Sequence, residues 1–171
     1  MTIRPATPAD ANILTELGAA TAREAFGPPH NPAGVVEAYV RTAFTVAALT
    51  EELTDPKAAF FLVEDADGRA VGYAKLRWKT PPRQLKLRPA LEIQRIYLLK
   101  QAVGQGLGRQ LMDQCLTFAR ESGYAAVWLG VWERNQTALG FYARMGFTRI
   151  GWHYFQFGPD RQRDFWLQKQ L

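Results

Sequence analysis

Apolar residues recur along the chain with two spacings, and each spacing predicts a different kind of element. Recurrence every three to four residues predicts helices, whereas alternation or a short continuous apolar run predicts strands. Helices are expected from Pro8 onward and over residues 31–44, 45–53, 109–121 and 137–145. Strands are expected over residues 2–7 and 90–99, in a hairpin at 58–79, and over 125–132, 147–157 and 163–170.

Two predicted helices begin with the residues that typically cap a helix. Thr7 precedes Pro8, and Asn31 precedes Pro32, so each pair offers a side-chain cap followed by proline at the first helical position. The predicted core-facing side chains of the first helix are Ile13, Leu14 and Leu17.

The order of the central elements predicts how the sheet is connected. A strand at 90–99, a helix at 109–121 and a buried strand at 125–132 imply a right-handed crossover between parallel strands. The hairpins elsewhere imply antiparallel pairing. With 171 residues that are 47% hydrophobic, the chain can build one substantial core. We therefore predict a mixed α+β fold, a single domain over 1–171, with helices flanking a mostly antiparallel sheet.

Three glycines stand where the strand at 90–99 gives way to a helix. Gly104, Gly106 and Gly108 alternate with other residues, a pattern suited to an anion held by backbone N–H groups at a helix start. A nucleotidase phosphate loop would need Lys and Ser or Thr after the last glycine, but Arg109 and Gln110 follow it. A dinucleotide fingerprint would need one more residue in its spacing. A tight turn without a ligand stays open at this point.

A second motif follows the buried strand at 125–132. Asn135 and Tyr142 lie seven residues apart, about two turns, on one face of a predicted helix. Asn135 is a natural helix cap, and Tyr142 is either a core aromatic residue or a phenol placed to donate a proton.

Together the two motifs resemble the GNAT superfamily of acyl-CoA-dependent N-acetyltransferases over essentially the whole chain. The cofactor loop Q/R-x-x-G-x-G/A is similar to residues 103–108, with Val103 where the family usually has Gln or Arg. The pattern N-x-x-A-x-x-F-Y-x-x-x-G-F is met by Asn135, Ala138, Phe141, Tyr142, Gly146 and Phe147. Within the superfamily, "LEIQRIYL", "VWLGVWERN" and the C-terminal segment resemble the bacterial PaiA-like polyamine N-acetyltransferases.

The resemblance implies acetyl-CoA as the co-substrate and a parallel strand pair that splays apart to admit it. The pantetheine arm is then expected to pair with the backbone of Ile96, Tyr97 and Leu98. The expected pyrophosphate loop is Gly104, Gln105, Gly106, Leu107, Gly108 and Arg109, and Asn135 completes the expected cofactor-binding set.

The resemblance also implies direct attack by a small-molecule primary amine on the acetyl thioester. Glu92 matches the position of the general base in several GNAT enzymes, with an ordinary charged residue at a strand end as the alternative. Tyr142 is the expected proton donor to the departing thiolate. An acetyl-CoA sensor without turnover and an enzyme acting on peptide N-termini are the alternatives.

The composition of the chain limits the kinds of binding partner that can be expected. The net charge of +5 and a pI near 9.6 would suit nucleic acid, but no binding motif accompanies them, and an anionic cofactor accounts for part of the charge. Cys115 has no partner for a disulfide, and no apolar segment reaches membrane-spanning length, so a cytoplasmic protein is expected. His30 and His153 lack ligand spacing, so no metal is expected. A homodimer is left open.

The predicted loop before Glu92 bears on the substrate. A polyamine would favour carboxylates near the entrance, yet this loop is rich in basic residues. They are Arg77, Lys79, Arg83, Lys86 and Arg88. A neutral amine, an amino acid or a drug-like amine therefore remains open beside a polyamine.

Overall fold

The computed structural model describes all 171 residues and contains the helices and strands in the predicted order. The strands are β1 (Thr2–Pro5), β2 (Ala58–Glu64), β3 (Ala70–Arg77), β4 (Ala90–Leu98), β5 (Ala126–Trp132), β6 (Thr148–Phe157) and β7 (Asp160–Gln170). The helices are α1 (Ala11–Phe26), α2 (Ala33–Ala43), α3 (Val46–Thr54), α4 (Leu107–Glu121) and α5 (Gln136–Arg144), with short 3₁₀ turns at Pro8–Asp10 and Lys100–Ala102. None of these helices is both long enough and apolar enough to cross a membrane.

The strands form a seven-stranded mixed sheet in the order β1-β2-β3-β4-β5-β7-β6. Strands β4 and β5, which the α4 crossover connects, pair in parallel. The pairs β1–β2, β5–β7 and β6–β7 are antiparallel. This confirms the predicted α+β class with one parallel pair in a mostly antiparallel sheet. By its own contacts the chain divides into two compact units, one formed by residues 1–76 and 95–112 and the other by 77–94 and 113–171.

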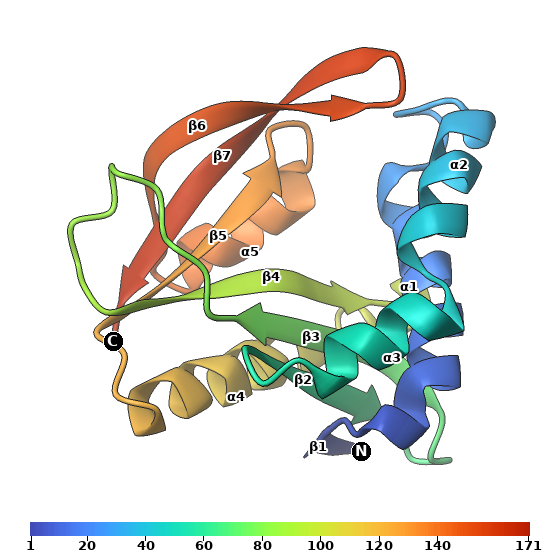
Figure 1. Ribbon diagram of the computed structural model, residues 1–171, viewed down its shortest axis with the longest axis horizontal. Helices are drawn as coiled ribbons and strands as arrows, with labels where there is room; N and C mark the ends of the chain where they lie inside the picture. Colours follow the sequence, from blue (N-terminus) through green and yellow to red (C-terminus); the bar gives the residue numbers. More distant parts are fainter. The chain divides into compact units, whose positions relative to one another are not determined.

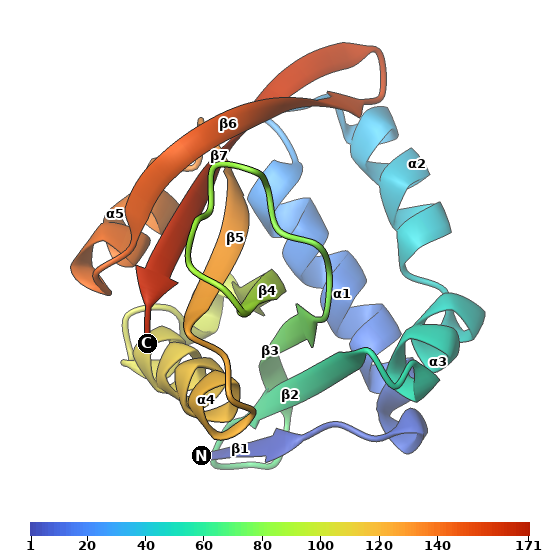
Figure 2. The ribbon, with the colours of Figure 1, turned by 60° about the vertical axis from the view of Figure 1, so that its left-hand side comes forward.

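In the first unit, α1 packs against α2 and α3, and α3 packs against β2 (Figures 1 and 2). Of the predicted core face of α1, Leu14 and Leu17 are buried, but Ile13 is 41% exposed. The prediction for Ile13 was wrong because the buried stripe of α1 runs through Ala11 and Leu14, and Ile13 lies at its edge.

The cap predicted at Asn31 was also wrong. Pro32 occupies the N-cap position of α2, which begins at Ala33, because Asn31 turns back towards the end of α1. Its side-chain amide donates to the carbonyl of Phe26 at 2.8 Å. Thr7 and Asp10 do form a capping box, but it closes the 3₁₀ turn that precedes α1.

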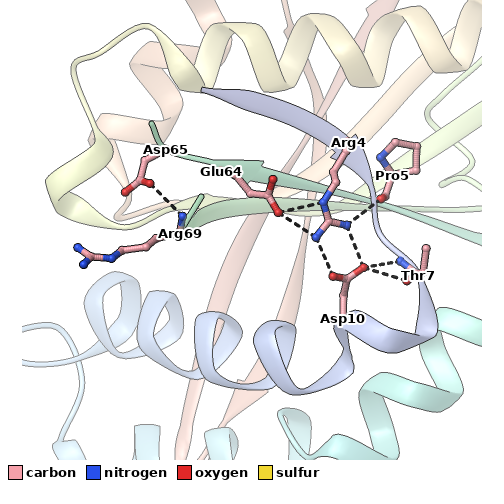
Figure 3. Close-up of polar contacts among 7 residues, drawn as sticks. All are labelled: Arg4, Pro5, Thr7, Asp10, Glu64, Asp65 and Arg69. Atoms are coloured by element: carbon pink, nitrogen blue, oxygen red, sulfur yellow. Dashed lines mark hydrogen bonds and ion pairs between the residues drawn. The ribbon is translucent and has the colours of Figure 1, made fainter. Parts of the chain in front are cut away.

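Arg4 joins β1 to the segment before α1 and to β2 (Figure 3). Its guanidinium donates to both carboxylate oxygens of Asp10, at 2.8 and 3.0 Å, and to Glu64 at 2.9 Å. These hydrogen bonds from Arg4, with those from Thr7, lower the pKa of Asp10 to about 2 although burial opposes the shift.

The second unit is built on the antiparallel strands β5, β7 and β6. The long β6–β7 hairpin is drawn in red in Figure 1. The β3–β4 loop packs onto one face of this sheet through Leu85 and Leu87, which contact the cluster around Trp128 and Trp166. Figure 2 shows this loop crossing in front of β5. A β-bulge between Arg149 and Gly151 shifts the register of β6 against β7.

We expect Asp10→Asn to lower the free energy of unfolding by about 1 kcal/mol at pH 7, a value reduced because Arg4 is one-third exposed. The folded pKa of Asp10 lies below its ordinary value of 3.8. The carboxylate therefore contributes stability above pH 4, and that stability is lost as the pH falls towards 2. Denaturant unfolding at pH 7 and pH 2.5 measures the difference. Asp67→Asn, at an exposed aspartate, is the control; equal losses in both variants at pH 7 would contradict the prediction.

Candidate active site

The glycine loop leaves a run of backbone N–H groups free. Gly104 and Gly106 have φ values of +88° and +79°, which other residues rarely adopt. None of the backbone N–H groups from Gly104 to Gly108 donates to an acceptor in the chain. A Cβ at Gly104 would meet no atom within 4 Å, and one at Gly106 would meet only the Gln110 side chain at 3.9 Å. These free donors precede and open α4, so the loop fits an anion such as a pyrophosphate.

Three hydrogen bonds hold the start of this loop. The backbone N–H of Lys100 donates to the carboxylate of Glu24 at 2.8 Å, and that of Leu99 donates to the carbonyl of Val71 at 2.8 Å. The side-chain amide of Gln105 donates back to the carbonyl of Gln101 at 2.9 Å, which closes the loop on itself. Val103 is 55% exposed.

The second half of β4 leads into the glycine loop and carries the predicted pantetheine-binding residues Ile96, Tyr97 and Leu98. All three are half-buried, whereas the first four residues of β4 are buried. Tyr97 packs edge-on against Phe26 and lies 6.1 Å from the Tyr73 ring. Gly72 lets β4 approach β3, because a Cβ there would collide with Leu98.

The parallel pairing of β4 with β5 is short. It joins Ala90–Glu92 to Ala126–Trp128 and stops there. Strand β5 continues for four more residues and stays paired with β7 up to Trp132. The two parallel strands are therefore paired only at their beginnings, the arrangement that the predicted splayed pair requires.

Tyr142 lies within α5 and is 7% exposed. Its ring packs edge-on against Phe141 and Phe147, with centroids 5.4 and 5.6 Å away. Burial raises the pKa of the phenol well above its ordinary value of 10, with the neighbouring thiol of Cys115 as a smaller cause. The hydroxyl makes no hydrogen bond within the chain. Tyr142 thus combines a core position with a protonated hydroxyl that has no internal partner.

Glu92 and Asn135 both have partners inside the second unit. The carboxylate of Glu92 is buried and receives hydrogen bonds from Nε and Nη2 of Arg77 on its two oxygens. The side-chain oxygen of Asn135 accepts from the backbone N–H of Ala138 at 3.0 Å, which confirms the predicted cap of α5.

The predicted residues fall into two sets. The glycine loop and residues 96–98 belong to the first unit, whereas Glu92, Asn135 and Tyr142 belong to the second. The structure gathers no three His, Cys, Asp or Glu side chains that could hold a metal ion. The sequence did not single out Asp164, which faces His153 across β6 and β7. No pattern in the sequence marks this pair, because the strand register brings it together.

We expect Gly106→Ala to weaken coenzyme A binding at least about tenfold, because a methyl group would stand among the free N–H groups. Its φ also costs any L residue about 1–2 kcal/mol of stability. Gly68→Ala is the matched control: Gly68 has φ +77° and an open Cβ position in the β2–β3 turn. Denaturant unfolding should show similar losses of stability in both variants. Calorimetry should show a loss of coenzyme A affinity only in Gly106→Ala. Unchanged affinity there would favour a tight turn without a ligand.

Comparison with known proteins identifies the family. Residues 22–147 match the model of the Acetyltransferase (GNAT) family. The chain is 36% identical over 151 residues to an uncharacterized N-acetyltransferase from the pepI 3′ region of Lactobacillus delbrueckii subsp. lactis, covering 88% of this chain and 86% of the relative. It is 34% identical over 162 residues to an uncharacterized N-acetyltransferase of Mycobacterium bovis, covering 95% and 98%.

The fold is also similar to that of a solved N-acetyltransferase structure. The crystal structure of the PaiA N-acetyltransferase from Thermoplasma acidophilum, in complex with coenzyme A, matches with a TM-score of 0.76 over 100% of both chains at 17% identity. The predicted resemblance to PaiA is thereby confirmed at the level of the fold. The chain belongs to the GNAT family of acetyltransferases and is an acetyl-CoA-dependent N-acetyltransferase.

Proposed function

We propose that the protein transfers the acetyl group of acetyl-CoA to a primary amine of a small molecule by direct attack. The observation that carries the proposal is the phenol of Tyr142, a buried side chain whose hydroxyl keeps its proton and has no hydrogen-bond partner in the chain. A protein that only sensed acetyl-CoA would have no use for such a donor.

Binding of acetyl-CoA is assigned to two stretches of the first unit. The free N–H groups from Gly104 to Gly108 would hold the pyrophosphate. The half-buried backbone of Ile96, Tyr97 and Leu98 would pair with the pantetheine arm. Neither contribution depends on the side chain of Val103.

Tyr142 would supply the proton that the leaving thiolate needs. A phenol whose pKa is raised by burial keeps its proton throughout the neutral range. Because the hydroxyl makes no internal hydrogen bond, no interaction has to break before it donates. Its packing against Phe141 and Phe147 fixes the ring that carries it.

Removal of a proton from the substrate ammonium is the second requirement. Glu92 remains the predicted base, but Arg77 engages both of its oxygens. Both carboxylate oxygens are therefore already engaged as hydrogen-bond acceptors within the chain. This weakens the case for Glu92 as the acceptor and directs attention to other carboxylates of the same unit.

The substrate is proposed to carry one positive charge rather than several. The side chains of Lys79, Arg83, Lys86 and Arg88 in the β3–β4 loop are exposed. Arg77 is compensated by Glu92, but these four cations would oppose a second ammonium group near the loop. We therefore expect phenethylamine to have a higher kcat/KM than spermidine in a thiol-release assay. A strong, salt-sensitive preference for spermidine would contradict this expectation.

Tyr142→Phe tests the catalytic role directly. The ring stays in place, so acetyl-CoA binding should be unchanged, while kcat should fall by roughly 10²–10⁴-fold because an interaction confined to the transition state is lost. The thiol-release assay measures kcat and calorimetry measures binding.

Tyr124→Phe, at a tyrosine outside α5 in the same unit, is the control for loss of a hydroxyl. A Tyr142→Phe enzyme with normal kcat would reduce Tyr142 to a core aromatic residue. Wild-type protein that binds acetyl-CoA but releases no thiol with any amine, amino acid or peptide N-terminus would favour the sensor.

A further inference from the structure

Strand β5 is open to solvent at one point in its middle. Leu129 and Val131 are 1% and 6% exposed, yet Gly130 between them is exposed. Gly130 follows Trp128 on the same face, just beyond the last residue that pairs with β4. The central strand β5 is thus exposed to solvent just beyond the point where its pairing with β4 ends.

Two acceptor groups stand over this position. A Cβ built on Gly130 would lie 3.3 Å from Oδ2 of Asp164 and 3.9 Å from Nε2 of His153. Asp164 and His153 are register partners in β7 and β6, with 3.8 Å between the same two atoms. The imidazole is stacked on Trp166 at 4.9 Å, which fixes its plane.

The protonation of His153 follows from its other nitrogen. Nδ1 lies 3.2 Å from the carbonyl oxygen of Tyr154, and because a carbonyl can only accept, Nδ1 carries the hydrogen. In the neutral ring Nε2 then presents a lone pair towards the Asp164 carboxylate. Two acceptors face each other over Gly130, and they call for a donor between them.

More unmatched polar atoms lie on the same face of the sheet. The side-chain oxygens of Gln94 and Gln168 and the indole N–H of Trp128 are buried and have no hydrogen-bond partner. Trp128 pairs with both Glu92 and Gln168 in register, so these residues share the face that bears Gly130. Buried polar atoms of this kind are normally satisfied. Both acceptor oxygens and an indole donor are unmatched here, so the face is suited to a polar ligand.

We propose that Gly130, Asp164 and His153 form the acceptor-amine site, in which Asp164 and His153 bind the substrate ammonium and Asp164 takes its proton. This inference rests on the proposed function and specifies where its second substrate binds. A primary ammonium has three N–H donors, two of which match the carboxylate and the imidazole nitrogen. Gly130 supplies the space, since any larger residue would project towards Asp164.

The ammonium gives one proton to the Asp164 carboxylate, which becomes a neutral carboxylic acid, and the nitrogen lone pair is freed. The nitrogen then bonds to the acetyl carbonyl carbon as the carbon–sulfur bond breaks. The thiolate takes the Tyr142 proton, the phenolate regains a proton from the nitrogen through solvent, and Asp164 releases its proton to solvent.

The environment of Asp164 favours a proton acceptor. Burial raises the pKa of its carboxyl to about 6, a shift that only a charged His153 would oppose. His153 is the titratable group that faces it from β6, while Gly130 and Trp132 face it from β5 and carry no charge. Arg163, next along β7, is on the opposite face of the strand and is held by Glu133 at 2.6 Å.

Asp164→Asn tests the site, with phenethylamine as the probe in the thiol-release assay. We expect kcat/KM for the amine to fall at least about 100-fold with acetyl-CoA affinity unchanged. The wild-type decline of kcat/KM as the pH falls through about 6 should disappear in this variant but persist in Glu92→Gln. Asp160→Asn, at an exposed carboxylate of the same strand, should match the wild type.

Gly130→Ala tests the space without removing a titratable group. It should raise the KM for the amine and leave acetyl-CoA binding unchanged, because its methyl group occupies the position over which Asp164 leans. A wild-type rate and pH profile in Asp164→Asn would overturn the inference while the proposed function stood. Absence of thiol release by the wild type with every amine would overturn the proposed function instead.

A measurement independent of any amine completes the test. In protein labelled with ¹³C at aspartate carboxyls, one resonance should titrate near pH 6 and be missing from the spectrum of Asp164→Asn. If the missing resonance titrates below pH 5, Asp164 is an ordinary exposed carboxylate, and the inference is overturned.

Discussion

Strand β5 is hydrogen-bonded to its two neighbouring strands over different lengths. The chemistry proposed for the protein depends on this difference in paired length. With β7 it pairs along all seven residues, but with β4 it pairs over only three. The long antiparallel pairing fixes β5 firmly, so the departure of β4 after Glu92 leaves strand edges without partners. Edges of this kind usually attract another strand. We propose that here they offer hydrogen bonds to an extended pantetheine arm instead.

Individual polar groups also lack hydrogen-bond partners in the folded chain. The N–H groups from Gly104 to Gly108, the hydroxyl of Tyr142 and the amide oxygen of Gln168 all lack acceptors or donors in the chain. Each such group costs free energy in the unliganded protein, most where it is buried. A ligand that supplied the missing partner to any of these groups would recover this energy on binding.

The sequence predicted those features that local patterns encode. Alternating glycines marked the loop before α4, Asn135 marked the start of α5, and an apolar run after a helix marked β5 as the parallel partner of β4. It was wrong where tertiary contacts outweighed a local signal. Asn31 follows a capping pattern, yet its amide serves the end of α1, and Ile13 has helical spacing but falls outside the buried stripe.

The Asp164–His153 pair could not be predicted for a different reason. Ile150 is the extra residue at the β6 bulge. Had β6 instead kept the register of Thr148 and Arg149, each later residue would pair with the β7 residue one position earlier in the chain. His153 would then stand opposite Arg163 rather than Asp164. One inserted residue therefore decides which side chain meets the carboxylate, and hydrophobic patterning does not reveal such an insertion in a strand that is half-exposed on both faces.

Glu92 and Asp164 illustrate how one sheet can carry two carboxylates with different roles. Both lie on the face that bears Gly130, and both are removed from bulk water to some degree. Arg77 donates two hydrogen bonds to Glu92, so both oxygens of that carboxylate are engaged within the chain. Asp164 has only an imidazole at 3.8 Å, and burial therefore dominates its pKa. By that reasoning the arginine marks Glu92 as the positioning residue at the end of the β4–β5 pairing and leaves the proton transfer to Asp164.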